Sequence, residues 1–174
     1  MADAPLKLAA RDSADLEVIA ACVQDALVPI GEMAYLPAEQ RFILVLNRFR
    51  WDRIDPKLAA EAERPNPRLQ SKGDAAFWEE GDSGPPFERV HTGLRFERVT
   101  AVRTRGIDLH NRDRILELLT IRSEPNAVSL LFAGNAAIRV EVAELRCFLE
   151  DFGEAWPTRW RPRHPEDDGA GGSP

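Results

Sequence analysis

The sequence contains few of the residues on which several common architectures and chemistries depend. Among its 174 residues there are only two cysteines, three histidines and one tyrosine. The cysteines, Cys22 and Cys147, lie far apart in apolar stretches, which excludes a disulfide scaffold and predicts buried free thiols in a reducing compartment. No histidine or cysteine has a second ligand at the spacing of a zinc site, and we expect neither a metal nor a cofactor.

Long apolar runs are also missing. No stretch reaches the roughly 18 apolar residues of a transmembrane helix, and no basic patch followed by an apolar run marks a secretory signal peptide. The sequence therefore predicts a cytoplasmic protein that does not contact a membrane. The glycine-rich loops of nucleotide-binding proteins and the serine motif of esterases are absent as well, which removes the usual signatures of those classes.

The chain has no excess of positive charge. Its 23 basic and 29 acidic residues give a net charge of −6, so a broadly basic nucleic-acid-binding protein is excluded as the default interpretation. Residues 52–86 carry −3 of this charge, whereas residues 87–153 are neutral. Nearly all basic residues are arginines, which suits bidentate contacts to carboxylate or phosphate, although a codon-composition bias would give the same pattern.

What the sequence does contain is enough apolar residue for one core. With 44% hydrophobic and 30% charged residues, it is typical of a single globular domain, which we place at residues 7–156. Residues 1–12 are expected to be irregular. Residues 52–86 hold five prolines and three glycines and are predicted to be a loop insertion, and residues 157–174 a flexible tail.

Periodicity predicts a series of strands between two helices. A helix over 13–24 starts after Asp12, a good N-cap residue. The strongest strand pattern, over 41–51, is apolar on both faces, which indicates a strand covered on both sides. Leu145, Phe148, Leu149 and Phe152 repeat at helical spacing and predict an amphipathic helix over 143–152, ended by Gly153. The remaining predicted strands cover 26–36, 88–105 with a bend at Gly93, 115–123, 128–132 and 138–142, the last two joined by a turn at Gly134-Asn135.

This order of elements predicts an α+β protein that is mainly antiparallel β. We expect a meander sheet or a partly open, pleckstrin-homology-like barrel, with a short N-terminal helix and a C-terminal amphipathic helix packed on it. The likeness to the pleckstrin-homology fold is an analogy of architecture and carries no function.

One cluster combines acids with an imidazole. Asp108, His110 and Asp113 lie in a predicted loop, where they could act as a general-base pair. A solvated loop with turn-forming Asp and Asn residues is the simpler explanation.

Arginines beside aromatic residues form the more informative pattern. They lie at the end of the strongest strand and along the next strand region, and if these strands pair, their polar faces could gather into one basic patch. Phe49 or Trp51 would then offer a stacking surface for phosphate or single-stranded nucleic acid. The alternative is an outward sheet face with cross-strand pairs to glutamates. The candidate ligand-binding residues are Arg48, Arg50, Trp51, Arg95, Arg98, Arg103 and Arg105.

Several blocks of the sequence resemble a known family of small bacterial proteins. The blocks are 27–51 (LVPIGEMAYLPAEQRFILVLNRFRW), 92–107 (TGLRFERVTAVRTRGI), and 137–142 (AIRVEV) leading to 155–159 (AWPTR). They are similar to DUF2948, a domain of unknown function, over about residues 7–164. The resemblance implies a bacterial, cytoplasmic protein and brings no catalytic residues with it.

Two functions of different classes follow from these patterns. The first is a non-catalytic protein-interaction or scaffold module of the bacterial cytoplasm, with an unknown protein partner. The second is weak binding of nucleic acid or a phosphate ligand through the Arg/aromatic patch. Since no coherent acid–base or metal cluster is present, the first fits best, and an enzyme that uses the loop around His110 is the third possibility.

Overall fold

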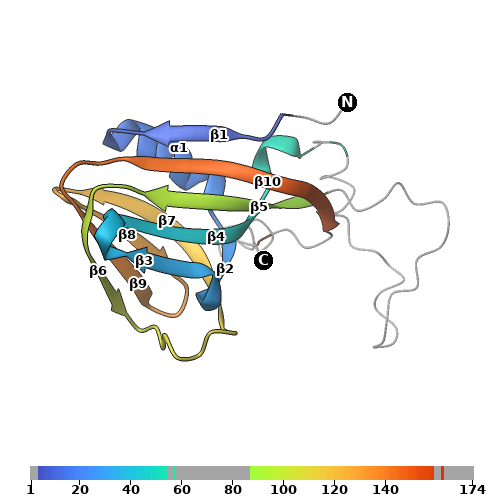
Figure 1. The fold of residues 1–174 in the computed structure, drawn as a ribbon. Coiled ribbons are helices and arrows are strands. Elements are labelled where there is room, and N and C mark those ends of the chain that lie inside the picture. Colours follow the sequence, from blue (N-terminus) through green and yellow to red (C-terminus); the bar gives the residue numbers. More distant parts are fainter. Residues whose placement is uncertain (1–3, 55–56, 58–86, 159–161, 163–174) are drawn as a thin grey trace, which may run out of the picture.

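The computed structural model describes residues 4–54, 57, 87–158 and 162, which form ten strands and an α-helix (Figure 1). Three single 3₁₀ turns, at Ile30–Glu32, Pro37–Glu39 and Trp51–Arg53, connect or end the strands. The elements are β1 (Lys7–Ala10), α1 (Ser13–Val23), β2 (Ala26–Pro29), β3 (Met33–Leu36), β4 (Arg41–Phe49), β5 (Phe87–Phe96), β6 (Val99–Arg105), β7 (Ile115–Glu124), β8 (Ala127–Phe132), β9 (Ala136–Val142) and β10 (Cys147–Thr158).

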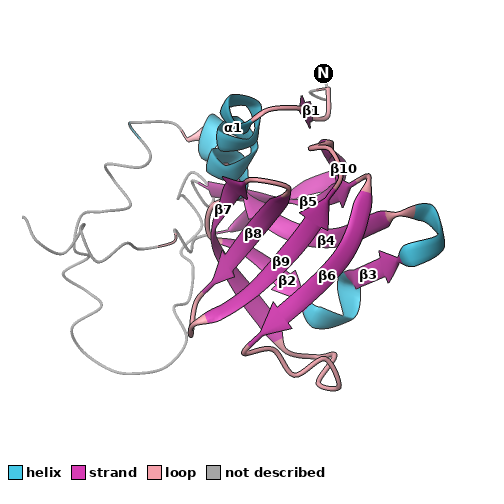
Figure 2. Cartoon of the chain, turned by 90° about the vertical axis from the view of Figure 1, so that its left-hand side faces the viewer, coloured by secondary structure: helices cyan, strands magenta, loops and turns pink. Residues whose placement is uncertain are grey.

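All ten strands belong to one antiparallel sheet that folds over on itself. Its order is β1-β10-β5-β4-β2-β7-β8-β9-β6, and β3 pairs with the first half of β4. The strands β1, β10, β5, β4 and β3 form one layer, and β7, β8, β9 and β6 form the second, with β2 between them (Figures 1 and 2). Within the described residues β1 and β6 are not paired with each other, so the predicted antiparallel sheet is confirmed but is not closed into a barrel.

The core lies between the two layers. Inward-facing positions alternate along each strand, so that Leu44 and Leu46 of β4, Leu94 of β5, and Leu130 and Ile138 of the second layer are almost completely buried. Each such side chain contributes roughly 1.5–3 kcal/mol by its removal from water. The two-residue period of the sequence therefore decides which residues form the core.

The predicted N-terminal helix is confirmed and closes one side of the core. Asp12 caps α1 by accepting a hydrogen bond from the backbone N–H of Asp15 at 2.8 Å. The buried face of the helix, Leu16, Ile19 and Val23, packs against β1, β4 and β7. The preceding residues, predicted to be irregular, include strand β1, which pairs with β10.

The predicted C-terminal helix is wrong, since residues Cys147–Thr158 form the long strand β10 between β1 and β5. Leu149 points into the core, whereas Phe148 is half-buried and Phe152 exposed on the outer face. A strand with apolar residues on both faces reproduces the spacing of an amphipathic helix over two turns. Gly153 has a φ of +71° next to a register shift between Phe152 and Trp156, so it belongs to a bulge and not to a helix end.

Two further strand predictions need correction. The region 26–36 is split into β2 and β3 by the turn at Ile30–Glu32. The region 88–105 bends at Glu97–Arg98, where Arg98 has a φ of +57°, and not at Gly93, which lies in the middle of β5. The turn at Gly134-Asn135 is confirmed, and both residues have positive φ values. Phe132 pairs with Ala136, so the loop also includes Ala133 and has three residues.

The predicted insertion and tail fall largely outside the described residues. Of 52–86, only 52–54 and 57 are described, and of 157–174, only 157, 158 and 162. Pro157 and Thr158 belong to β10, so this strand extends into the segment predicted to be a tail. In the described part of the chain, no helix has the length and apolar character needed to cross a membrane.

Both cysteines are free thiols, as the sequence predicts. Burial raises the pKa of Cys147, which is fully buried, and the pKa of Cys22, which is partly buried on α1. Because the thiolate is the reactive form, we expect iodoacetamide at pH 8 to modify both thiols far more slowly in the folded protein than in urea, and Cys147 last. A Cys22→Ser variant isolates Cys147, and equal rates for that thiol with and without urea would contradict its burial.

Candidate functional site

Arg48, the first of the predicted ligand-binding residues, lies inside the protein. Its side chain extends inward from β4, and its Nε and Nη2 donate hydrogen bonds to the two carboxylate oxygens of Asp151 on β10, at 2.8 and 2.6 Å. Thr92 of β5 donates a third hydrogen bond to Asp151 at 2.7 Å. Arg48 is 1% and Asp151 6% exposed. This guanidinium therefore links β4 to β10 and is not available to a ligand.

Asp52 extends the buried pair toward the surface. Nη1 of Arg48 donates to its carboxylate at 2.9 Å. Burial by itself would raise the pKa of Asp52, but the hydrogen bond and the charge of Arg48 outweigh it and hold this pKa below its ordinary value. Burial likewise opposes the charge on Arg48, but the hydrogen bonds that Arg48 donates to Asp151 and Asp52 outweigh it, so the pKa of Arg48 is raised. Both shifts favour the charged forms of Arg48 and Asp52.

Arg50 and Trp51 are also engaged within the protein. Arg50 pairs with Glu88 of β5 at 2.7 Å. Trp51 donates from its indole Nε1 to the carbonyl of Gln24 at 3.2 Å and packs on the fully buried Phe49, with ring centroids 4.5 Å apart. The aromatic surface predicted for stacking at this strand end therefore lies largely in the core.

The other four arginines of the predicted set lie in two separate places. Arg95 is on the outer face of β5, above the ring of Phe148 at 4.7 Å, and Arg98 is exposed at the β5–β6 corner. Arg103 and Arg105 lie on the outer face of the second layer, at the edge strand β6. The structure thus distributes the seven predicted residues over three locations and does not gather them into one patch.

The acid–imidazole cluster forms a turn. The carboxylate of Asp108 accepts a hydrogen bond from the backbone N–H of His110 at 3.0 Å, and both residues and Asp113 are exposed. This is the local geometry of an Asx turn. Over the described ranges, no group of three or more histidine, cysteine or acidic side chains could hold a metal ion.

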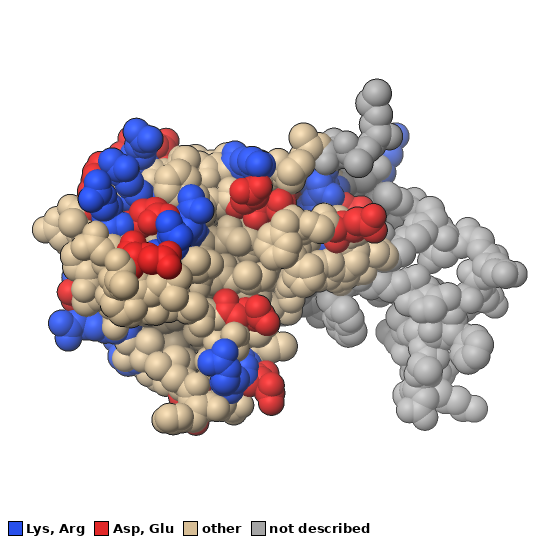
Figure 3. Space-filling view, in the orientation of Figure 1, with Lys and Arg blue, Asp and Glu red and all other residues tan. Residues whose placement is uncertain are grey.

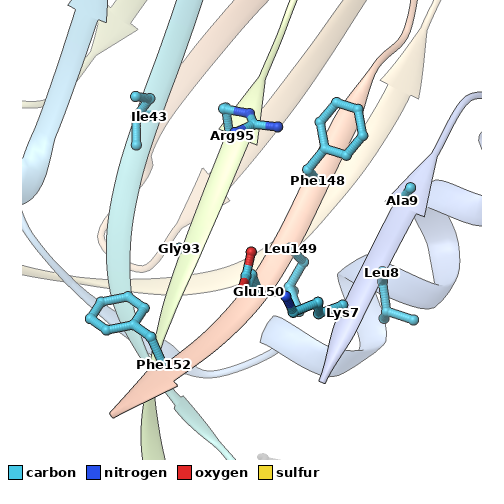
Figure 4. A pocket seen from close by; sticks show the side chains of 10 residues that line it. All are labelled: Lys7, Leu8, Ala9, Ile43, Gly93, Arg95, Phe148, Leu149, Glu150 and Phe152. Carbon is cyan, nitrogen blue, oxygen red and sulfur yellow. Dashed lines mark ion pairs between the residues drawn. The ribbon is translucent and has the colours of Figure 1, made fainter. Parts of the chain in front are cut away.

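A different surface, on the first layer, carries a broad hollow. It lies on the outer face of the sheet, has a volume of about 490 Å³, and spans β1, β10, β5 and β4 (Figure 4). We call it the Gly93 groove, because Gly93 lies at its centre opposite Val45 of β4 and Glu150 of β10. Its lining residues are Lys7, Leu8, Ala9, Ile43, Gly93, Arg95, Phe148, Leu149, Glu150 and Phe152.

Aromatic rings stand at both ends of the Gly93 groove. Phe148 and Phe152 leave β10 on the same outer face, on either side of Glu150 (Figure 4). Phe152 is 46% exposed. His91 supports it by stacking on its ring, with centroids 5.9 Å apart, and Trp156 packs on His91 at 4.6 Å. The exposed phenyl ring is therefore held in place by its neighbours.

The charges around the groove are paired with one another. Lys7 of β1 and Glu150 of β10 form an ion pair at 2.8 Å, and Arg95 pairs with Glu97 at 3.0 Å. In the space-filling view, uncharged surface on this face is interspersed with charged groups of both signs (Figure 3). Glu150 lies between Phe148 and Phe152 within the groove, and Lys7 neutralises its charge.

Comparison with models of protein families finds a match for nearly the whole sequence. Residues 6–164 match the model of DUF2948, described as a protein of unknown function. The chain belongs to the DUF2948 family. Neither the curated proteins nor the solved structures contain a match. The matched range confirms the resemblance noted in the sequence, and it includes every described strand of this DUF2948 protein.

The groove of this DUF2948 protein is hidden in the sequence for two reasons. The spacing of Phe148 and Phe152 indicates a helix, whereas they share the outer face of the strand β10. Gly93 in a strand pattern indicates a bend, whereas it lies in the middle of β5. The usable signal is a glycine with an ordinary strand conformation in the middle of an otherwise continuous strand pattern, next to apolar residues on the outward positions.

Proposed function

We propose that this DUF2948 protein is a non-catalytic protein-interaction module of the cytoplasm, and that the Gly93 groove receives a large apolar side chain of a partner protein. Gly93 is the observation that carries the proposal. The two free thiols fit a reducing compartment. The family match gives no activity with which this function would conflict.

Gly93 has no structural reason to be glycine. It lies in the middle of β5 without a positive φ, and a Cβ added there would meet its nearest atoms, Glu150 O and Phe152 Cε1, at 3.8 and 3.9 Å. These are ordinary van der Waals distances. A glycine inside a strand costs roughly 0.5–1 kcal/mol relative to alanine. A strand glycine at such a cost commonly marks a place where a ligand or another chain approaches the backbone.

The surroundings of Gly93 fit a protein partner better than a charged ligand. The ion pairs Lys7–Glu150 and Arg95–Glu97 leave no net charge at the rim, so a polyanion finds no attraction there. Phe148 and Phe152 supply apolar walls for a single inserted side chain. Binding energy at protein interfaces is concentrated on such anchors, which fill a pocket surrounded by polar contacts.

A groove-filling variant tests the proposal. Gly93→Ala is expected to leave stability unchanged or raise it by about 0.5–1 kcal/mol in urea unfolding. Gly93→Leu directs a side chain into the groove and should keep the fold. We expect a random linear-peptide display library, selected on the wild type, to yield sequences with a recurring aromatic or long aliphatic residue, and Gly93→Leu to weaken their binding at least about tenfold.

Ala137→Leu is the matched control, because it adds the same side chain to the outward face of β9, in the second layer. The selected peptides should bind this variant like the wild type. Peptides that bind Gly93→Leu as well as the wild type would overturn the proposal. So would a selection that yields only acidic sequences, or sedimentation of the wild type as a dimer that Gly93→Leu dissociates, since the occupant would then be a second copy of this chain.

A further inference from the structure

Four arginines gather on the outer face of the second layer, opposite the Gly93 groove. Three of them form a row with Ser129 across four neighbouring strands: Arg103 of β6 pairs in register with Arg139 of β9, Arg139 with Ser129 of β8, and Ser129 with Arg122 of β7. Arg105 occupies the next outward position of β6. Figure 2 looks onto this layer, and we call the four residues the arginine face.

Only part of the positive charge on this face is neutralised. Glu141 pairs with Arg103 at 2.9 Å and lies 4.0 Å from Arg139, and Glu124 accepts hydrogen bonds from Arg139 and Ser129. Arg105 and Arg122 form no ion pair with any other described residue and are exposed. Four arginines against two glutamates leave two positive charges in excess, on a chain whose net charge is −6.

The face carries a hollow beside its like charges. Arg103 and Arg139 lie directly opposite each other, a placement in which like charges destabilise a sheet, and Glu141 and Glu124 offset this by pairing with them. The four arginines line a surface hollow of about 310 Å³ together with Ser129 and Glu124. Exposed guanidinium groups that form no ion pair, such as those of Arg105 and Arg122 among the described residues, are donors that bind phosphoryl oxygens.

We propose that the arginine face binds a ligand with two linked phosphoryl groups. Arg105 of β6 and Arg122 of β7, which form no ion pair with any other described residue, line the same hollow from different strands, so two cations face two linked anionic groups. No aromatic ring lines the hollow among the described residues, so a nucleobase finds no ring to stack on there. The phosphoryl groups are therefore the recognised part, whether they belong to free diphosphate or to a nucleoside diphosphate.

An NMR titration of the full chain with inorganic diphosphate and, separately, with ADP tests this site. At low salt we expect saturable shifts of the backbone amides around Arg103, Arg105, Arg122 and Arg139, with equal affinity for the two ligands. Arg105→Gln combined with Arg122→Gln should weaken the binding of both ligands at least about tenfold. The matched control is Arg98→Gln with Arg114→Gln, which removes the same charge from exposed arginines that directly precede β6 and β7 and should bind like the wild type.

Each other outcome overturns the proposal. Shifts that never saturate, or that the control double variant loses equally, would show only non-specific attraction. Tighter binding of ADP than of diphosphate would mean that the base is recognised, and binding of a single-stranded oligouridine in place of diphosphate would identify a nucleic-acid surface. Gly93→Leu should not change diphosphate binding, so this site and the proposed protein-binding groove can fail independently.

Discussion

Arg48→Ala is expected to destabilise the protein by about 3–5 kcal/mol, because it leaves the buried carboxylate of Asp151 without its charged partner. The two hydrogen bonds between Arg48 and Asp151 are 2.8 and 2.6 Å long, and no solvent reaches the guanidinium. Removing one partner therefore forces a buried charge to remain unpaired or to take up a proton. Urea unfolding followed by circular dichroism measures the loss as a lower midpoint at an unchanged slope.

A double variant distinguishes the loss of the ion pair from a simple loss of packing. Arg48→Met combined with Asp151→Leu replaces both charges with apolar groups, and we expect it to recover most of the stability that Arg48→Ala loses. Arg103→Ala is the control for removing an arginine from a surface ion pair, and its cost should stay below about 1 kcal/mol. A loss under 1 kcal/mol for Arg48→Ala would show that the pair is not buried as described.

Leu149→Ala is expected to cost about 2–5 kcal/mol, the range for emptying a fully buried leucine site. Leu149 is 1% exposed on the inner face of β10. Phe152→Ala, three residues further, removes a side chain that is 46% exposed on the opposite face, and should cost no more than about 1 kcal/mol. Urea unfolding of the two variants compares the two faces of the strand directly.

The same comparison tests the assignment of β10 as a strand. In the amphipathic helix that the spacing suggested, Leu149 and Phe152 would share the buried face, and both substitutions would be strongly destabilising. Equal large losses would therefore contradict the strand. Phe148→Ala gives a third comparison. Phe148 is half-buried on the same face as Phe152, so the loss of stability should fall between those of Leu149→Ala and Phe152→Ala.

The parts of the fold that could be predicted from the sequence are those specified by local signals. The Asp12 cap and the apolar stripe of α1, the alternation in β4 and the Gly134-Asn135 turn each depend on a few neighbouring residues. The strand β10 could not be recognised in this way. Its identity depends on β1 and β5, which lie far away in the sequence and pair on both sides of it.

The same distinction between local signals and long-range pairing applies to the candidate sites. The sequence identifies arginines, but only the register between strands decides that Arg103 meets Arg139 and Arg122 on one face. It also cannot show that Arg48, two residues from Arg50, points inward to Asp151, more than 100 positions further along the chain. Residue type predicted the kind of chemistry, and long-range pairing decided where it lies.

The position of β10 also determines when the fold can form during synthesis. This strand lies between β1 and β5, yet its residues leave the ribosome after those of the other nine described strands. Until then, β5 has an uncovered edge along its length, and Lys7 cannot meet Glu150. Such non-local pairing slows folding, and open strand edges invite association between nascent chains. We therefore expect the first layer to be completed only after translation has passed residue 158.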